Sequence, residues 1–148
     1  MRKSQRSISR IFNASKYKIG IVVAQFNNNI TNKILASALE KLEEYNILNE
    51  NIDVRYVGGS VEIPVILQTM AKTKKYDCLI AIGAVIKGET DHYHYVAQIV
   101  TDGILRVMMD FNLPVGFAVL TTPDLKLAQK RINIGADAVS ATLQNAII

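Results

Sequence analysis

Four short runs of strand-like composition recur along the chain, and a segment with helical spacing follows each of them. The runs cover residues 17–24, 52–57, 77–83 and 114–120. The first (YKIGIVVA) is a continuous aliphatic stretch, which is typical of a strand buried on both faces, and the third (DCLIAIG) contains the apolar run over residues 78–82. Because right-handed crossovers join strands that alternate with helices, this order predicts a mostly parallel four-stranded sheet with helices on both faces.

The segments between the runs carry helix signals. From Ile30 to Tyr45 the apolar residues recur every three or four positions, with charged residues on the other side. Pro64 fits the first turn of a helix that we expect to end near Lys74. The last segment is expected to be helical from about Ala136.

Two further helices are predicted from their first residues. Thr90 or Asp91 can cap the first of them, and Thr122 followed by Pro123 suits the start of the second. The first of these helices is expected to bury one apolar stripe, which consists of Val96, Ile99, Val100, Ile104, Val107 and Met108.

The positive charge of the chain is concentrated at its N-terminus. The net charge is +4, yet residues 1–18 contain no acidic residue, and their basic residues are Arg2, Lys3, Arg6, Arg10, Lys16 and Lys18. A nucleic-acid-binding fold normally carries its basic stripe on the folded face, so no nucleic-acid partner is expected. We expect a basic arm over residues 1–16, followed by a single domain over residues 17–148.

The cysteine content and hydropathy indicate the compartment. Cys78 is the only cysteine and cannot form an internal disulfide, which favours a reducing compartment. Its place in an apolar run favours a small buried hydrophobe over a nucleophile. No apolar run approaches the roughly 20 residues that cross a bilayer, and the N-terminus lacks the apolar core of a secretory signal. A cytoplasmic protein that does not bind membranes is expected, with an organelle-targeting segment as the alternative.

Unusual residues gather where the predicted strands end, which is the edge of an open α/β sheet where ligands bind. Phe26 follows the first strand and is either a core residue at the rim or a platform for a flat ring. Gly58 and Gly59 follow the second strand and allow close approach to the backbone. Glu62 fits two roles, a favourable charge at a helix start or an acceptor for sugar-like hydroxyls.

The third strand leads into KGETDHYH. Free backbone N–H groups before a helix, together with the Thr90 hydroxyl, suit a phosphate, although an ordinary helix cap has the same sequence. Glu89 is expected to point away from such an anion. His92 is a candidate proton carrier, whereas His92 and His94 alone are too few ligands for zinc. No metal or cofactor is expected, and the common nucleotide and hydrolase motifs are absent.

Three blocks, VVAQFNNNIT, VGGSVEIPV and AIGAVIKGETDHYHYV, followed by GFAVLT, jointly resemble the signature blocks of the lumazine synthase family. The resemblance runs from about Lys18 to the C-terminus. It implies a flavodoxin-like three-layer sandwich that assembles as a homopentamer, sometimes stacked into larger shells. It also implies that an N-terminal arm, here residues 8–14, adds a strand to a neighbouring subunit.

The resemblance implies a transferase of riboflavin biosynthesis. It would condense 5-amino-6-(D-ribitylamino)uracil with 3,4-dihydroxy-2-butanone 4-phosphate and release phosphate and water, with riboflavin synthase as a further partner. In the uracil site, Phe26 would stack on the ring, and Ser60, Val61 and Glu62 would bind the ribityl chain. The backbone of Ala84, Val85 and Ile86 would contact the pyrimidine. Phe117 of the adjacent subunit would complete the pocket. The butanone phosphate would bind at Glu89, Thr90 and Arg131, and His92 would transfer protons.

The chain departs from the family pattern after Arg131. INIGADA follows this arginine at once, whereas family members have several residues before a segment resembling GNKGxEA, and Ile134 takes the place of the usual lysine. The shortened loop leaves capsid formation and the strength of phosphate binding open. Two rival hypotheses are a non-catalytic flavodoxin-like flavin-binding module and an assembly protein that has lost catalysis.

Overall fold

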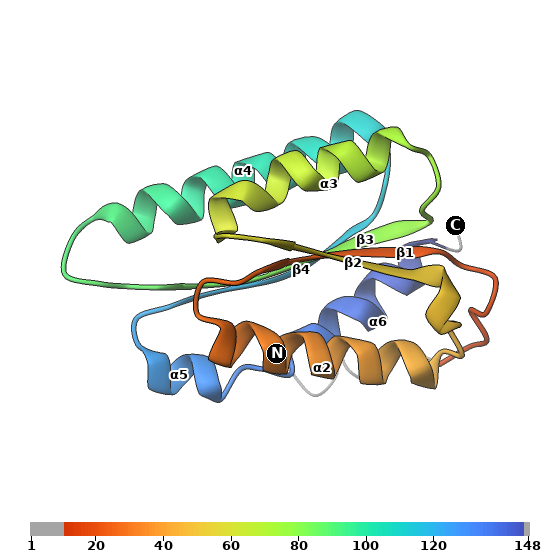
Figure 1. Cartoon of the computed structure of the whole chain (residues 1–148), viewed down its shortest axis with the longest axis horizontal. Helices are drawn as coiled ribbons and strands as arrows, with labels where there is room; N and C mark the ends of the chain where they lie inside the picture. Colours follow the sequence, from red (N-terminus) through yellow and green to blue (C-terminus); the bar gives the residue numbers. More distant parts are fainter. Residues whose placement is uncertain (1–10, 147–148) are drawn as a thin grey trace.

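The computed structural model describes residues 11–146, and these residues form a three-layer α/β sandwich (Figure 1). The strands are β1 (Ile19–Ala24), β2 (Ile52–Val57), β3 (Cys78–Ile86) and β4 (Val115–Thr122). All neighbours pair in parallel, in the order β2-β1-β3-β4. This arrangement confirms the predicted four-stranded parallel sheet.

Helices cover both faces of the sheet, as the sequence predicts. The helices are α2 (Asn28–Glu44), α3 (Ile63–Lys72), α4 (His92–Phe111), α5 (Leu125–Gln129) and α6 (Ile134–Ala146), with short 3-10 turns η1 (Asn49–Asn51) and η2 (Ser60–Glu62). In Figure 1, α3 and α4 lie above the sheet, and α2, α5 and α6 lie below it. Each face has its own apolar core. No helix among residues 11–146 is long and apolar enough to cross a membrane.

Of the two central strands, β1 is shorter and β3 is longer than the sequence suggests. Every residue of β1 is buried, but the strand begins at Ile19, two residues later than expected. The prediction that the third strand ends at Gly83 is wrong, because β3 continues to Ile86. The added residues pair with β4, where Ala84 lies opposite Leu120 and Ile86 opposite Thr122. Pairing partners supply this signal, and a single segment cannot reveal them.

Two predictions about the helices are wrong. Thr122 is the last residue of β4 and caps no helix. Asp124 caps α5 instead, because its Oδ1 accepts a hydrogen bond from the backbone N–H of Leu127 at 2.8 Å. Ile99 was expected on the buried stripe of α4, yet half of its surface is exposed. The sequence of α4 is apolar around much of its circumference, so spacing alone does not identify the buried side.

Cys78 lies fully buried at the start of β3. Burial, with a smaller contribution from the neighbouring charge of Asp77, raises the pKa of its thiol to about 12. A thiol with this pKa is protonated at neutral pH, so the interpretation of Cys78 as a small hydrophobe holds.

The N-terminal arm lies partly outside the described residues, since these begin at Ile11. Residues 11–14 form no strand within this chain. Phe12 packs edge-on against Tyr45 with ring centroids 5.2 Å apart, and the backbone N–H of Ala14 donates to the Tyr45 carbonyl at 2.8 Å. The described end of the arm is therefore held against the end of α2.

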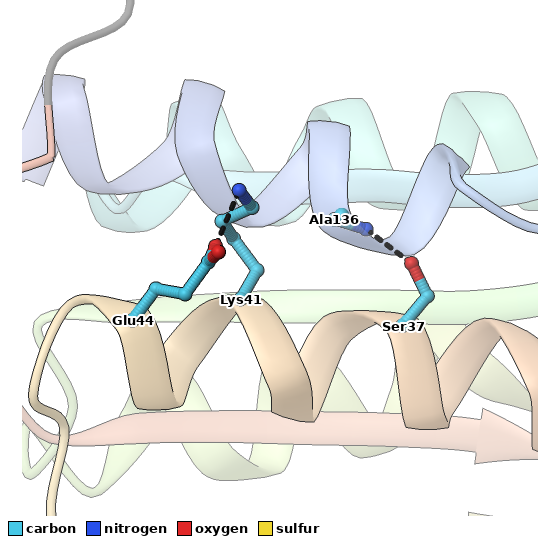
Figure 2. A network of polar contacts seen from close by, with 4 residues as sticks. All are labelled: Ser37, Lys41, Glu44 and Ala136. Atoms are coloured by element: carbon cyan, nitrogen blue, oxygen red, sulfur yellow. Dashed lines mark hydrogen bonds and ion pairs between the residues drawn. The ribbon is translucent and has the colours of Figure 1, made fainter.

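Helices α2 and α6 are in close contact. A Cβ atom on Gly135 would lie 2.2 Å from the backbone oxygen of Ile34, so only glycine fits this crossing. One turn along α2, the Ser37 hydroxyl accepts a hydrogen bond from the backbone N–H of Ala136 at 3.0 Å (Figure 2). Lys41 and Glu44 form an ion pair on the same helix (Figure 2). Ser37 therefore caps the first turn of α6 from a neighbouring helix.

Candidate active site

A cavity of about 410 Å³ opens at the carboxyl ends of β1, β2 and β3. This volume lies in the usual range for small-molecule sites. Its lining consists of Phe26, Gly59, Ser60, Val61, Glu62, Ala84, Val85, Ile86, Gly88, Thr90, His92, Tyr93 and Val96. The structure therefore brings together most of the candidate residues, which come from three separate segments of the sequence.

The cavity lies at the point where the strand order reverses. In the order β2-β1-β3-β4, the chain runs from β1 to β2 toward one edge of the sheet and from β3 to β4 toward the opposite edge. Crossovers on opposite faces diverge at such a point, so the ends of the two central strands leave a crevice between them. The observed strand order thus accounts for the position of the cavity.

The end of β3 offers backbone groups to the cavity. Its pairing with β1 stops at Ile82, opposite Val23, while its pairing with β4 continues to Ile86. The N–H of Leu79 donates to the carbonyl of Pro114, just before β4, and the N–H of Lys87 donates to the carbonyl of Thr122, at the end of β4. Because backbone groups alternate in direction along a strand, those of Ala84 and Ile86 point to the opposite side, toward the end of β1. A flat ligand with amide-like edges can pair with backbone in this position.

Small residues make room around the second segment. A Cβ on Gly59 would lie 3.4 Å from a carboxylate oxygen of Glu62, so this carboxylate folds back over the glycine turn. A Cβ on Gly83 would lie 2.5 Å from the hydroxyl of Ser60, which is itself buried. The hydroxyl and the carboxylate therefore lie close to the backbone at the cavity wall, where they suit a polyhydroxyl chain.

Phe26 lies at the mouth of the cavity with 72% of its surface exposed. A core residue would be buried, so the interpretation of Phe26 as a core residue at the rim is wrong. Its backbone N–H donates to the carbonyl of Gly58 at 2.9 Å, and the N–H of Gln25 donates to Val57 at 2.8 Å. These bonds continue the pairing of β1 with β2 beyond the last strand residue.

The loop before α4 forms the other end of the cavity. The Thr90 hydroxyl accepts a hydrogen bond from the backbone N–H of His92 at 3.3 Å. Asp91 is the N-terminal cap of α4 by position, but its side chain makes no capping bond. His92 is exposed on the first turn of this 20-residue helix. The positive end of the helix dipole and a titratable ring thus meet at one end of the cavity.

Sequence reasoning missed two lining residues, Tyr93 and Val96, as members of the site. Both lie on α4 close to His92, and Val96 is one turn further along. Val96 was assigned to the buried stripe and is half-buried. Helical spacing from His92 is the signal that identifies Val96, four residues further on, whereas no such spacing identifies Tyr93.

Three candidates lie outside the cavity. Glu89 is exposed and is not part of the lining, which agrees with the expectation that it points away. Phe117 lies on the outer strand β4 with 39% of its surface exposed, and Arg131 is exposed between α5 and α6. Within residues 11–146 of one chain, neither Phe117 nor Arg131 joins the other candidates.

No group of three or more histidine, cysteine, aspartate or glutamate side chains could hold a metal ion within the part of the chain that the structure describes. His92 and His94 are both exposed on the first turn of α4. The lining of the cavity offers an aromatic ring, hydroxyl and carboxylate groups, backbone groups and an imidazole.

The fold and the cavity define an α/β sandwich protein with a small-molecule site at the switch point of its sheet. Residues 16–147 match the family model of 6,7-dimethyl-8-ribityllumazine synthase. The match covers essentially the whole chain, and the chain belongs to that family. The family is one of transferases in riboflavin biosynthesis.

Proposed function

We propose that the chain condenses 5-amino-6-(D-ribitylamino)uracil with 3,4-dihydroxy-2-butanone 4-phosphate to give 6,7-dimethyl-8-ribityllumazine. The observation that carries this proposal is the convergence of Phe26, the turn over residues 60–62 and the free end of β3 around one cavity. A flat ring with a polyhydroxyl chain matches these three elements, and the family match supports the same substrates.

The ribitylaminouracil would lie across the carboxyl edge of the sheet. Its ring stacks on Phe26, a contact worth about 1–3 kcal/mol per ring in comparable aromatic sites. Its polar ring edge lies along Ala84, Val85 and Ile86, where the backbone groups of Ile86 are the ones free to pair with it. Its ribityl chain binds beside Ser60, Val61 and Glu62, where the carboxylate accepts hydrogen bonds from hydroxyls.

The butanone phosphate would bind at the start of α4. Backbone N–H groups near Glu89 and the Thr90 hydroxyl face the phosphate, and the helix dipole favours its negative charge. With both substrates in place, the free amine of the uracil attacks the ketone to form an imine. The imine forms with loss of one water. Phosphate then leaves to give an enol, which tautomerises to a ketone, and the second nitrogen attacks this ketone and closes the ring with loss of a second water.

The reaction needs proton transfers at the end of the cavity where phosphate leaves. His92 lines that end, and an imidazole can both donate and accept a proton. Proton transfer by a positioned side chain typically contributes 10²–10⁴-fold, and holding two reactants together contributes about 7–11 kcal/mol at most. His92 would therefore assist a reaction that depends mainly on positioning.

The site would be completed by a second copy of the chain. Phe117 and Arg131 are exposed on the β4 side of the molecule. In an oligomer, these two residues of one copy would reach the cavity of the adjacent copy. Helix α4 also exposes a set of large apolar side chains, namely Tyr95, Ile99, Leu105 and Met109. Because large exposed apolar patches mark interfaces, we propose a homo-oligomer with a pentamer as its unit.

The test is an absorbance assay with both substrates, run beside a measurement of phosphate release. Turnover well above the uncatalysed condensation, with one phosphate per lumazine, is expected. His92→Ala should slow turnover by about 10²-fold or more while the oligomer seen by light scattering stays intact. Wild-type turnover equal to background, combined with tight binding of oxidised flavin, would replace the proposal with a binding module. A normal rate for His92→Ala would remove the role of His92.

A further inference from the structure

Asn27, which follows Phe26, has an unusual backbone conformation. Its φ of 62° and ψ of 43° lie in the left-handed region, which is unfavourable for most residues with a side chain. The other non-glycine residues with positive φ within residues 11–146 are Asn46, Lys74 and Asn112, and each follows the end of a helix. Left-handed residues are common after helices, whereas Asn27 precedes one. This backbone conformation therefore points to a local function.

The side chain of Asn27 also departs from its usual role. Asparagine at the start of a helix normally accepts a hydrogen bond from a backbone N–H of the first turn. Asn27 makes no such bond, although its backbone carbonyl accepts hydrogen bonds from Ile30 and Thr31, as is usual at the start of a helix. Its Nδ2 donates to the backbone carbonyl of Ala84 at 2.9 Å. The carboxamide thus joins the turn after β1 to the end of β3.

This bond crosses the opening between the two central strands. The pairing of β1 with β3 ends at Val23 and Ile82, and the cavity begins beyond that pair. On its other side, the turn is tied to β2 by the backbone bonds that Gln25 and Phe26 donate. Phe26 is therefore held between the ends of β2 and β3 by hydrogen bonds on both sides.

Backbone control matters here because the ring of Phe26 is mostly exposed and has little packing to hold it. We propose that Asn27 is a positioning residue that sets the Phe26 ring relative to the backbone of Ala84 and Ile86. The inference rests on the proposed function, in which this gap receives the pyrimidine. The hydrogen bond between Asn27 and Ala84 fixes the width of the gap between Phe26 and the end of β3. The backbone groups of Ile86, which point into the same gap, stay available for a ligand.

Two substitutions separate the carboxamide from the backbone conformation. Asn27→Asp keeps the side-chain shape and tolerates the left-handed region, but its carboxylate cannot donate to Ala84. Asn27→Gly adopts the same backbone conformation without strain and has no side chain. Asn112→Gly is the matched control, because it makes the same change at a left-handed asparagine. Asn112 follows the C-terminal end of α4, whereas the cavity lies at the N-terminal end of that helix.

The probe is 5-nitro-6-(D-ribitylamino)uracil, which cannot condense because it lacks the nucleophilic amine. Calorimetry should give a Kd about 3–10-fold higher for both Asn27 variants, as expected for one lost hydrogen bond, and an unchanged Kd for Asn112→Gly. In steady-state assays the KM for the ribitylaminouracil should rise, while the KM for the butanone phosphate stays at the wild-type value. Thermal unfolding of each variant establishes that it is folded.

Three results would overturn the inference in distinguishable ways. If folded Asn27→Asp and Asn27→Gly both bind the probe as wild type does, Asn27 does not position the ring. Equal rises in both KM values would indicate a general structural role instead. If the wild-type protein neither binds the probe nor turns over, the proposed function itself fails, and the inference fails with it.

Discussion

Replacing Gly135 by alanine tests how closely α2 and α6 pack. The added Cβ would lie 2.2 Å from the backbone oxygen of Ile34 and 3.1 Å from the backbone nitrogen of Ala38. Neither atom can rotate away, since both belong to the backbone of α2. Helix α6 must therefore move outward by roughly 1 Å to restore an ordinary contact distance.

This movement would also disturb the cap of α6. The hydrogen bond from Ala136 to Ser37 measures 3.0 Å, and a shift of roughly 1 Å would take it beyond hydrogen-bond range. Overpacking costs about 1–3 kcal/mol, and the lost bond adds about 1 kcal/mol. The higher helix propensity of alanine returns up to about 1 kcal/mol. The expected net loss is about 1–3 kcal/mol of unfolding free energy.

The assay is thermal and urea unfolding of Gly135→Ala beside Gly88→Ala. A Cβ on Gly88 meets nothing within 4 Å, and its φ is not positive, so that variant should be as stable as wild type or slightly more stable. Gly135→Ala should lower Tm by about 3–10 °C in a protein of this size. Equal Tm values for the two variants would refute the close contact between the helices.

The other predictions concern the site and the far edge of the sheet. Phe26→Ala should leave stability within about 0.5 kcal/mol, because the ring is mostly exposed, yet raise the Kd of the nitro probe roughly 5–150-fold; an unchanged Kd in calorimetry would exclude stacking. Arg131→Ala should raise the KM for the butanone phosphate more than that for the uracil, and equal changes would argue against a phosphate contact. Burial and a 2.6 Å hydrogen bond to Asp53 raise the pKa of Tyr76 above 10.0. The resulting stabilisation is complete below pH 10 and is lost as the pH rises through the folded-state pKa. Urea unfolding at several pH values should therefore show a weaker alkaline decline for Tyr76→Phe, and an identical decline would exclude this residue as the cause.

The sequence predicted the layers and the position of the site because those depend on patterns within single segments. The continuous apolar run over residues 17–24 predicted a strand buried on both faces, and every residue of β1 is buried. The rule that ligands bind beyond strand ends then led to Phe26, Glu62 and Thr90, which line one cavity. These predictions needed no knowledge of which residues pair across the sheet.

Features that depend on partners distant in the sequence could not be predicted. Gly83 followed by Ala84 reads as the end of a strand, and only the pairing with β4 extends β3 to Ile86. Threonine is a common helix cap, but Thr122 pairs with Ile86 as the last residue of β4. The run QFNNN contains three asparagines of equal propensity, and only the carbonyl of Ala84 distinguishes Asn27 from the other two. Pairing and side-chain partners belong to the tertiary structure.

Because Cys78 is buried, the rate at which its thiol is alkylated reports how often β3 separates from the neighbouring strands. A protonated thiol inside β3 reacts with alkylating reagents only after the strand separates from its neighbours, because the thiolate is the reactive species. With one cysteine in the sequence, each labelled molecule records one such event. At low reagent concentration, the labelling rate measures the equilibrium population of molecules in which the start of β3 is open. Mass spectrometry can therefore follow the stability of the native protein without denaturant, through a residue at the opposite end of β3 from the cavity.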